Sequence, residues 1–197
     1  MDHADWDRRY TAAELVWTAR PNRFLVAEAL PLAPGRALDL AAGEGRNAVW
    51  LAERGWTVTA VDFSAVGLEK GRAMASHRGV VVDFVQGDVT EWRAEEAVFD
   101  LVCVLYLQVP AAARGAAMRA AAEALAPGGA LVVVAHDIRN LTDGVGGPQD
   151  PSVLYGPEDV LADLDGLPGL RAERAERVLR PVGGRDAIDT LVRVRRA

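Results

Sequence analysis

One stretch of the sequence constrains the fold more than any other: a short apolar run, a glycine-rich turn and an apolar helical stripe follow one another. Residues 36–40 are mostly apolar, Gly43 and Gly45 form the turn, and residues 47–54 carry the stripe. Residues 57–61 are rich in β-branched side chains and end at Asp62. Parallel neighbouring strands need a crossover connection, usually a helix, so this strand–helix–strand pattern predicts a βαβ unit.

The alternation of strand and helix patterns continues along the chain. Further strands are predicted at residues 80–85, 99–105, 130–135, 172–179 and 188–194, and helices at 64–74, 111–125 and from Pro157 onward. We therefore expect an α/β fold with a mainly parallel sheet and helices on both faces. Residues 1–197 are expected to be a single domain, with an N-terminal helical cap at 1–35, interrupted at Pro21, and a core at 36–197.

Charge and composition narrow the class of partner. The formal net charge is −6, which disfavours nucleic acid, and no apolar run reaches the roughly 20 residues that would cross a membrane. The arginines of the last segment alternate with acids such as Asp186 and Asp189, a pattern typical of a solvated face. The N-terminus is acidic and lacks an apolar stretch, so a cytoplasmic location is expected.

Metal and disulfide chemistry are not expected. Cys103 is the only cysteine and lies in an apolar run, where cysteine usually packs as a small hydrophobic side chain. No His, Cys or Asp cluster has the spacing of metal ligands.

The glycine turn and the acid that follows it predict a nucleotide-like ligand. Glycines allow a ligand to approach the backbone closely, and the helix N-terminus offers free N–H groups. Asp62 comes 19 residues after Gly43, at the end of the second strand, where a carboxylate can accept hydrogen bonds from both hydroxyls of a ribose. This pattern alone also fits a nicotinamide or flavin dinucleotide.

Three motifs together resemble those of the class I S-adenosylmethionine-dependent methyltransferase family. Residues 38–45 are similar to its first motif, with Asp39 four residues before Gly43. Residues 86–89 are similar to the family's third-strand end, where the matching acid and apolar residue, here Asp88 and Val89, contact the adenine. Residues 125–131 resemble its turn into the fifth strand. The similarity covers about residues 39–137; it departs at Ala41 and Ala42, where many relatives have cysteine or glycine.

The resemblance implies a Rossmann-like methyltransferase fold with a seven-stranded sheet of order 3-2-1-4-5-7-6 and an antiparallel seventh strand. More loosely, the aromatic N-terminus and the sequence Gly45-Arg46-Asn47 resemble the branch of tellurite-resistance and thiopurine methyltransferases. In that branch N-terminal tryptophans lie over the cofactor, which would make Trp6 and Trp17 a lid; ordinary packing of the cap is the alternative. The expected cofactor contacts are Trp6, Trp17, Asp39, Ala41, Gly43, Gly45, Asn47, Asp62, Phe63, Ser64, Asp88, Val89, Val104 and Leu105.

Acceptor contacts are expected where the fourth and fifth strands end, because ligands of open α/β sheets bind at the carboxyl ends of the strands. Tyr106, Leu107 and Gln108 follow the fourth strand, and His136, Asp137 and Arg139 follow the fifth. His136 and Asp137 are the candidate catalytic residues, as a proton acceptor and the group that orients it.

The sequence therefore predicts a methyltransferase that uses S-adenosylmethionine and methylates a small-molecule acceptor, as a monomer or homodimer. Two alternatives remain open at this point. One is a protein that binds S-adenosylmethionine without catalysis, and the other is a nicotinamide-dependent oxidoreductase, which Asp39 and Asp88 disfavour.

Overall fold

The computed structural model describes residues 3–12, 14–94 and 97–197. It contains a seven-stranded sheet of order β3-β2-β1-β4-β5-β7-β6, in which only the pairings of β7 with β5 and β6 are antiparallel. The predicted strand order and the antiparallel last strand are confirmed. The strands are β1 (Arg36–Leu40), β2 (Thr57–Asp62), β3 (Asp83–Gln86), β4 (Phe99–Leu105), β5 (Leu125–His136), β6 (Leu170–Val182) and β7 (Arg185–Arg196).

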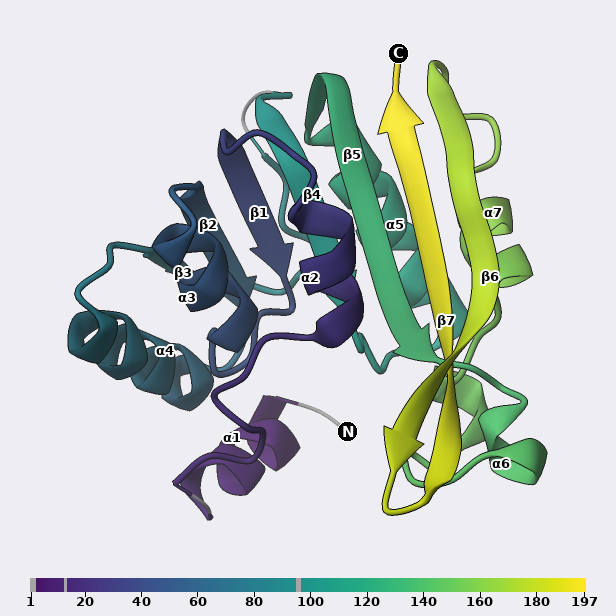
Figure 1. The fold of residues 1–197 in the computed structure, drawn as a ribbon, viewed down its shortest axis with the longest axis horizontal. Helices are drawn as coiled ribbons and strands as arrows, with labels where there is room; N and C mark the ends of the chain where they lie inside the picture. The colour runs from purple at the N-terminus through teal and green to yellow at the C-terminus, as the bar shows by residue number, and fades with distance from the viewer. Residues whose placement is uncertain (1–2, 13, 95–96) are drawn as a thin grey trace.

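Helices cover both faces of the sheet, with α2 and α3 in front and α5 and α7 behind in Figure 1. Alternate residues of the central strands supply the two cores: Leu38 and Leu131 pack on one side, and Ala37 and Val132 on the other. The helices are α1 (His3–Thr11), α2 (Arg23–Ala29), α3 (Arg46–Glu53), α4 (Ala65–Arg78), α5 (Ala111–Glu123), α6 (Asn140–Asp143) and α7 (Pro157–Leu164), with a 3₁₀ turn at Pro151–Val153. Among the described helices, none is long and apolar enough to cross a bilayer.

The cap has the two short helices that Pro21 predicts, α1 and α2, although residues 1–2 lie outside the described residues. α2 begins after Asn22, whose side-chain oxygen accepts hydrogen bonds from the backbone N–H groups of Phe24 and Leu25. α2 packs against the sheet, whereas α1 contacts α4 and lies beyond the carboxyl ends of the parallel strands (Figure 1). The cap therefore reaches the edge where a ligand is expected.

Several strand boundaries differ from those predicted. β3 begins three residues later than predicted, because residues 80–82, which follow the end of α4 at Gly79, do not pair with a neighbouring strand. Val81 in this segment is 90% exposed. β5 begins five residues early, since the predicted turn at 127–129 stays within the strand and shifts its register against β4 between Phe99 and Leu101. β6 and β7 extend past their predicted ends and pair as a long hairpin as far as Val182 and Arg185.

Candidate active site

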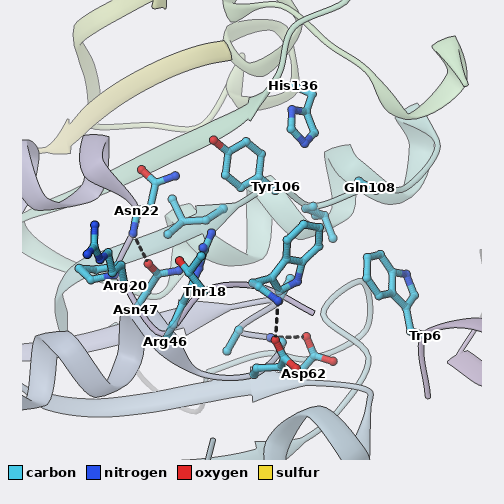
Figure 2. Close-up of a pocket in the computed structure, with 18 of the residues that line it drawn as sticks. Trp6, Thr18, Arg20, Asn22, Arg46, Asn47, Asp62, Tyr106, Gln108 and His136 are labelled. Atoms are coloured by element: carbon cyan, nitrogen blue, oxygen red, sulfur yellow. Dashed lines mark hydrogen bonds between the residues drawn. The ribbon is translucent and has the colours of Figure 1, made fainter. Parts of the chain in front are cut away.

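A cavity of about 540 Å³ opens at the carboxyl edge of the sheet. Figure 2 shows Asp62 at one end, Tyr106 and His136 at another, and the side chains of the N-terminal cap beside them. The cavity is lined by Trp6, Tyr10, Trp17, Thr18, Arg20, Pro21, Asn22, Arg23, Ala41, Ala42, Gly43, Glu44, Arg46, Asn47, Asp62, Phe63, Leu105, Tyr106, Leu107, Gln108, Val109, His136, Arg180 and Pro181.

Asp62 holds the glycine turn. One carboxylate oxygen accepts a hydrogen bond of 2.8 Å from the N–H of Gly43, and the other accepts one of 2.9 Å from the N–H of Ser64. A carboxylate at the end of the second strand, beside a glycine turn, is the group that accepts hydrogen bonds from ribose hydroxyls in folds of this kind. Gly43 has a φ of +56°, and a Cβ there would lie 2.7 Å from the Tyr10 hydroxyl oxygen. The turn thus requires glycine, and the site fits the ribose of a nucleoside.

Glu44 ties the cap to this turn. Its buried carboxylate accepts hydrogen bonds of 3.0 Å from the backbone N–H groups of Val16 and Trp17, and it forms an ion pair of 3.1 Å with Lys70 of α4. These contacts fix the segment that brings Trp17 into the cavity lining. Tyr10, which stacks on Trp6 with ring centroids 5.5 Å apart, belongs to the same lining.

Four side chains from four neighbouring strands form a polar cluster at the opposite end. Tyr106 follows β4, His136 ends β5, and Asp189 and Arg180 belong to the β6–β7 hairpin. Asp189 is fully buried and accepts a hydrogen bond of 2.8 Å from the Tyr106 hydroxyl and one of 2.6 Å from Arg180. His136 Nδ1 lies 3.4 Å from Asp189 Oδ1, and the His136 ring lies 4.5 Å from that of Tyr106.

The charge of Asp189 persists in spite of its burial. Burial raises the pKa of this carboxyl, but the nearby His136 ring, hydrogen bonds from Arg180 and Tyr106, and the positive charge of Arg180 lower it below its ordinary value. The pKa of Tyr106 is raised, first by burial and then by the charge of Asp189. The phenol therefore stays protonated and donates to Asp189.

The predicted site residues fall into two groups. Eleven of them line the cavity: Trp6, Trp17, Ala41, Gly43, Asn47, Asp62, Phe63, Leu105, Tyr106, Gln108 and His136. The other eight do not: Asp39, Gly45, Ser64, Asp88, Val89, Val104, Asp137 and Arg139.

Packing explains why five of the predicted cofactor contacts lie outside the lining. Val104 and Val89 belong to the hydrophobic core, and Asp39 is buried in β1 against the Cys103 thiol, with 3.4 Å between Sγ and Oδ1. Gly45 begins α3 and packs against the Phe84 ring, which a Cβ would approach to 2.8 Å. Ser64 caps α4, accepting from the Gly67 N–H at 3.1 Å and donating to Asp7.

Asp88 has a different environment, because it lies at the carboxyl end of β3 beside the strand that carries Asp62. Its side chain is exposed and accepts hydrogen bonds of 2.9 and 2.7 Å from Thr90. A contact between Asp88 and adenine stays a prediction.

The structure does not support a catalytic role for Asp137. Its carboxylate is fully buried and is satisfied by the Arg139 N–H at 2.8 Å, the Thr190 hydroxyl at 2.9 Å and Arg177 at 2.9 Å. The side chain of Arg139 is exposed, outside the cavity lining. Asp189, rather than Asp137, lies beside His136, because the register of β5 and β7 pairs these two residues directly.

The prediction of a solvated face for the last segment is wrong for Asp189 and Arg180. β7 lies between β5 and β6, so Ala187, Asp189 and Leu191, spaced two apart, are all completely buried. Thr190 and Val192 are completely buried as well, so the place of β7 inside the sheet, and not a period of two in the sequence, accounts for the burial of Asp189. The lining residues Arg20, Asn22, Arg46 and Arg180 had no local signal either, because the cap and the hairpin meet only through tertiary packing.

Comparisons with known proteins show what this chain is similar to. Residues 37–129 match the family described as "Methyltransferase domain". The demethylmenaquinone methyltransferase of Thermus thermophilus is 36% identical over 124 residues, which are 62% of this chain and 54% of that protein. The chain therefore spans about half the length of the relatives it matches.

Two solved structures share the fold over nearly the whole chain. The N-methyltransferase NodS of Bradyrhizobium japonicum, solved with S-adenosylhomocysteine, has a TM-score of 0.75 at 17% identity and covers 98% of this chain and 97% of its own. TehB of Haemophilus influenzae has a TM-score of 0.75 at 16% identity, covering 97% of this chain and 66% of its own. Residues 37–129 are therefore similar to a methyltransferase domain, and the chain shares its fold with solved methyltransferase structures such as NodS.

Proposed function

We propose that the protein binds S-adenosylmethionine and transfers its methyl group to a small-molecule acceptor. One observation carries the proposal: a single cavity joins Asp62 and the glycine turn to Tyr106, Gln108 and His136. Donor and acceptor can therefore lie in one chamber, as an in-line displacement requires. Relatives such as demethylmenaquinone methyltransferase support a small organic acceptor.

The donor half uses residues of β1, β2 and the cap. Asp62 accepts hydrogen bonds from the ribose, the Gly43 backbone allows close approach, and Phe63 lies beside them in the lining. Trp6 and Trp17 close the chamber and exclude water from it. When bound, S-adenosylmethionine supplies an electrophilic methyl group.

The acceptor half uses residues at the ends of β4 and β5. We assign His136 as the proton acceptor and Tyr106 and Gln108 as acceptor contacts. Asp189 lies beside His136 Nδ1, so the ring can direct Nε2 toward the cavity. Much of the catalysis would come from positioning the two substrates and excluding water.

We also propose that the chain acts as a single domain whose cap, residues 1–35, is part of the site, in the manner of the tellurite-resistance and thiopurine methyltransferase branch. The sequence Gly45-Arg46-Asn47 and the presence of Trp6 and Trp17 in the cavity lining support this assignment. The fold shared with TehB is compatible with it.

Calorimetry with S-adenosylhomocysteine tests the donor half. We expect binding by the wild type and a loss of at least about tenfold in affinity for Asp62→Ala, because the ribose contacts disappear. Asp62→Asn keeps the shape of the side chain, so it separates loss of the ribose contacts from collapse of the glycine turn. Asp83→Ala is the matched control, because it removes an exposed carboxylate from the neighbouring strand β3. Absence of wild-type binding, or full affinity in both Asp62 variants, would overturn the assignment.

Turnover tests the acceptor half. Methyl-labelled S-adenosylmethionine should label at least one compound from a panel of thiols, amines, phenols and chalcogen oxyanions. His136→Ala should then slow transfer to that compound. Binding without transfer to any of them would favour the alternative of a non-catalytic S-adenosylmethionine-binding protein.

A further inference from the structure

Positive charge gathers at the cavity of a chain whose net charge is negative. Four arginines line it, Arg20, Arg23, Arg46 and Arg180, against two acids, Glu44 and Asp62. Arg180 is neutralised by Asp189, and Glu44 by Lys70. Arg20 and Arg46, however, form no ion pair with any carboxylate in the described part of the chain.

Arg46 is the more confined of the two. It lies in the first turn of α3, half-buried, between the main cavity and a smaller one of about 170 Å³, and it lines both. Burial lowers the pKa of its guanidinium, while the nearby Tyr106, Asp39 and Glu44 raise it. A half-buried guanidinium that lines two cavities and has no carboxylate partner favours an anionic ligand there.

Two amides beside Arg46 have their oxygens occupied. Asn22 Oδ1 accepts from the N–H groups of Phe24 and Leu25, and Asn47 Oδ1 accepts from the Asn22 N–H at 2.8 Å. These bonds fix both amides, so what each has left to offer a ligand is its NH₂ group.

Figure 2 shows Arg20, Asn22, Arg46 and Asn47 on one side of the cavity, with Trp6 and Gln108 on the other. We call these four residues the donor cluster, because each has N–H donors and none has an acidic side chain. We propose that the donor cluster binds a carboxylate, held by Arg46 with support from the amides of Asn22 and Asn47. This inference rests on the proposed function, since it assigns a ligand group to the same cavity.

The carboxylate has two possible sources, the amino-acid part of S-adenosylmethionine and the methyl acceptor. Both present the same planar oxyanion, which a guanidinium binds through two parallel hydrogen bonds. Two pairs of ligands, each differing in the carboxylate, distinguish the two sources. 5′-Methylthioadenosine has the nucleoside and sulfur of S-adenosylhomocysteine but no carboxylate, and benzamide has the shape of benzoate without its charge.

The experiment measures calorimetric affinities of the wild type, Arg46→Gln and Arg46→Lys. If the cofactor supplies the carboxylate, Arg46→Gln should weaken the binding of S-adenosylhomocysteine by at least about tenfold and leave the affinity for 5′-methylthioadenosine unchanged. If the acceptor supplies it, both nucleosides should bind normally, and wild type saturated with S-adenosylhomocysteine should bind benzoate but not benzamide. In that case Arg46→Gln should no longer bind benzoate. Arg46→Lys should retain part of either effect, because it keeps the charge but not the planar fork.

Arg54→Gln is the matched control, since it removes the same charge at the exposed end of α3, outside the cavity lining. Equal weakening of S-adenosylhomocysteine and 5′-methylthioadenosine by Arg46→Gln would reduce the residue to a structural role and overturn the proposal. Unchanged nucleoside binding with no binding of benzoate would overturn it as well. Failure of the wild type to bind either nucleoside would instead refute the proposed function.

Discussion

The Tyr106 hydroxyl donates a hydrogen bond of 2.8 Å to the buried carboxylate of Asp189, joining the end of β4 to β7 across β5. Tyr106 makes this contact from the left-handed region of backbone conformation, with a φ of +58°. Such a conformation costs a non-glycine residue roughly 1–3 kcal/mol, so surrounding contacts must maintain it. The bond to Asp189 is one of them, and the ring that it holds lies 4.5 Å from the ring of His136.

Asp189→Asn should destabilise the fold. The substitution removes the charge that pairs with Arg180 at 2.6 Å and leaves that guanidinium without its buried partner, which we expect to lower the free energy of unfolding by about 3 kcal/mol at pH 7. Urea denaturation measures the change. Asp186→Asn, on the exposed part of the same hairpin, should have almost no effect.

The pH dependence of this difference has a defined direction. Because the folded-state pKa of Asp189 is lowered, its contribution to stability is present above its unfolded pKa and is lost as the pH falls through the folded value. The gap between wild type and Asp189→Asn should therefore shrink below about pH 4. Equal stability of the two proteins at pH 7 would show that the buried contacts of Asp189 contribute nothing.

Glu44→Gln should loosen the cap. Glutamine has one side-chain acceptor oxygen and no charge, so it cannot hold the N–H groups of Val16 and Trp17 together with Lys70. Hydrogen exchange at the Val16 and Trp17 amides should become at least about tenfold faster. Glu53→Gln breaks an ion pair on α3 of similar length, 3.0 Å to Arg78, and should leave these two amides unchanged. Unaltered exchange in Glu44→Gln would contradict the anchoring role.

Asp39→Asn should stabilise the protein at high pH. Burial raises the pKa of Asp39 from 3.8 to about 7, while the Cys103 thiol partly offsets this rise. One oxygen, Oδ2, has no hydrogen-bond partner among the described residues. Ionisation therefore costs folding free energy, and that cost grows as the pH rises from about 4 to about 7 and is then constant.

Thermal denaturation at two pH values provides the measurement. The gain in stability from Asp39→Asn should be about 2 kcal/mol larger at pH 8 than at pH 5. A gain that does not vary with pH would mean that the carboxyl is already ionised at the lower pH.

Ala41→Gly should be neutral or stabilising. Ala41 has a φ of +63°, which costs an alanine roughly 1–2 kcal/mol, and glycine removes that strain while losing about 0.5–1 kcal/mol through its greater freedom in the unfolded chain. Ala42→Gly is the control, because Ala42 packs in the core and is not among the described residues with positive φ. That variant should lower the melting temperature; a larger loss from Ala41→Gly than from Ala42→Gly would refute the argument from strain.

The local patterns were strong enough to predict much of the core. The apolar runs, the glycine turn and Asp62 predicted the βαβ unit and a ribose-binding end, and the family motifs implied the strand order that the structure confirms. Asp62 and Gly43 are close in space because parallel strands bring their carboxyl ends to one edge. Residues of this kind are predictable because period, turn chemistry and strand direction are local properties.

The acceptor side depended on contacts between distant segments. His136 was predicted from the end of β5, but its neighbour Asp189 comes from β7 and Arg180 from β6, so an antiparallel hairpin had to fold back before the cluster existed. Asp137, adjacent in sequence, points into the core instead, since neighbouring positions of an extended chain face opposite sides.

The sequence by itself determined the fold class, the strand order implied by its motifs, and the glycine and acid that define the donor end. Only the tertiary structure decided which charges are buried, that Glu44 holds the cap, and that Arg20, Asn22, Arg46 and Asn47 meet as one donor cluster. The physical reason is that the burial of a side chain depends on what packs over it. For these residues the covering elements lie elsewhere in the chain.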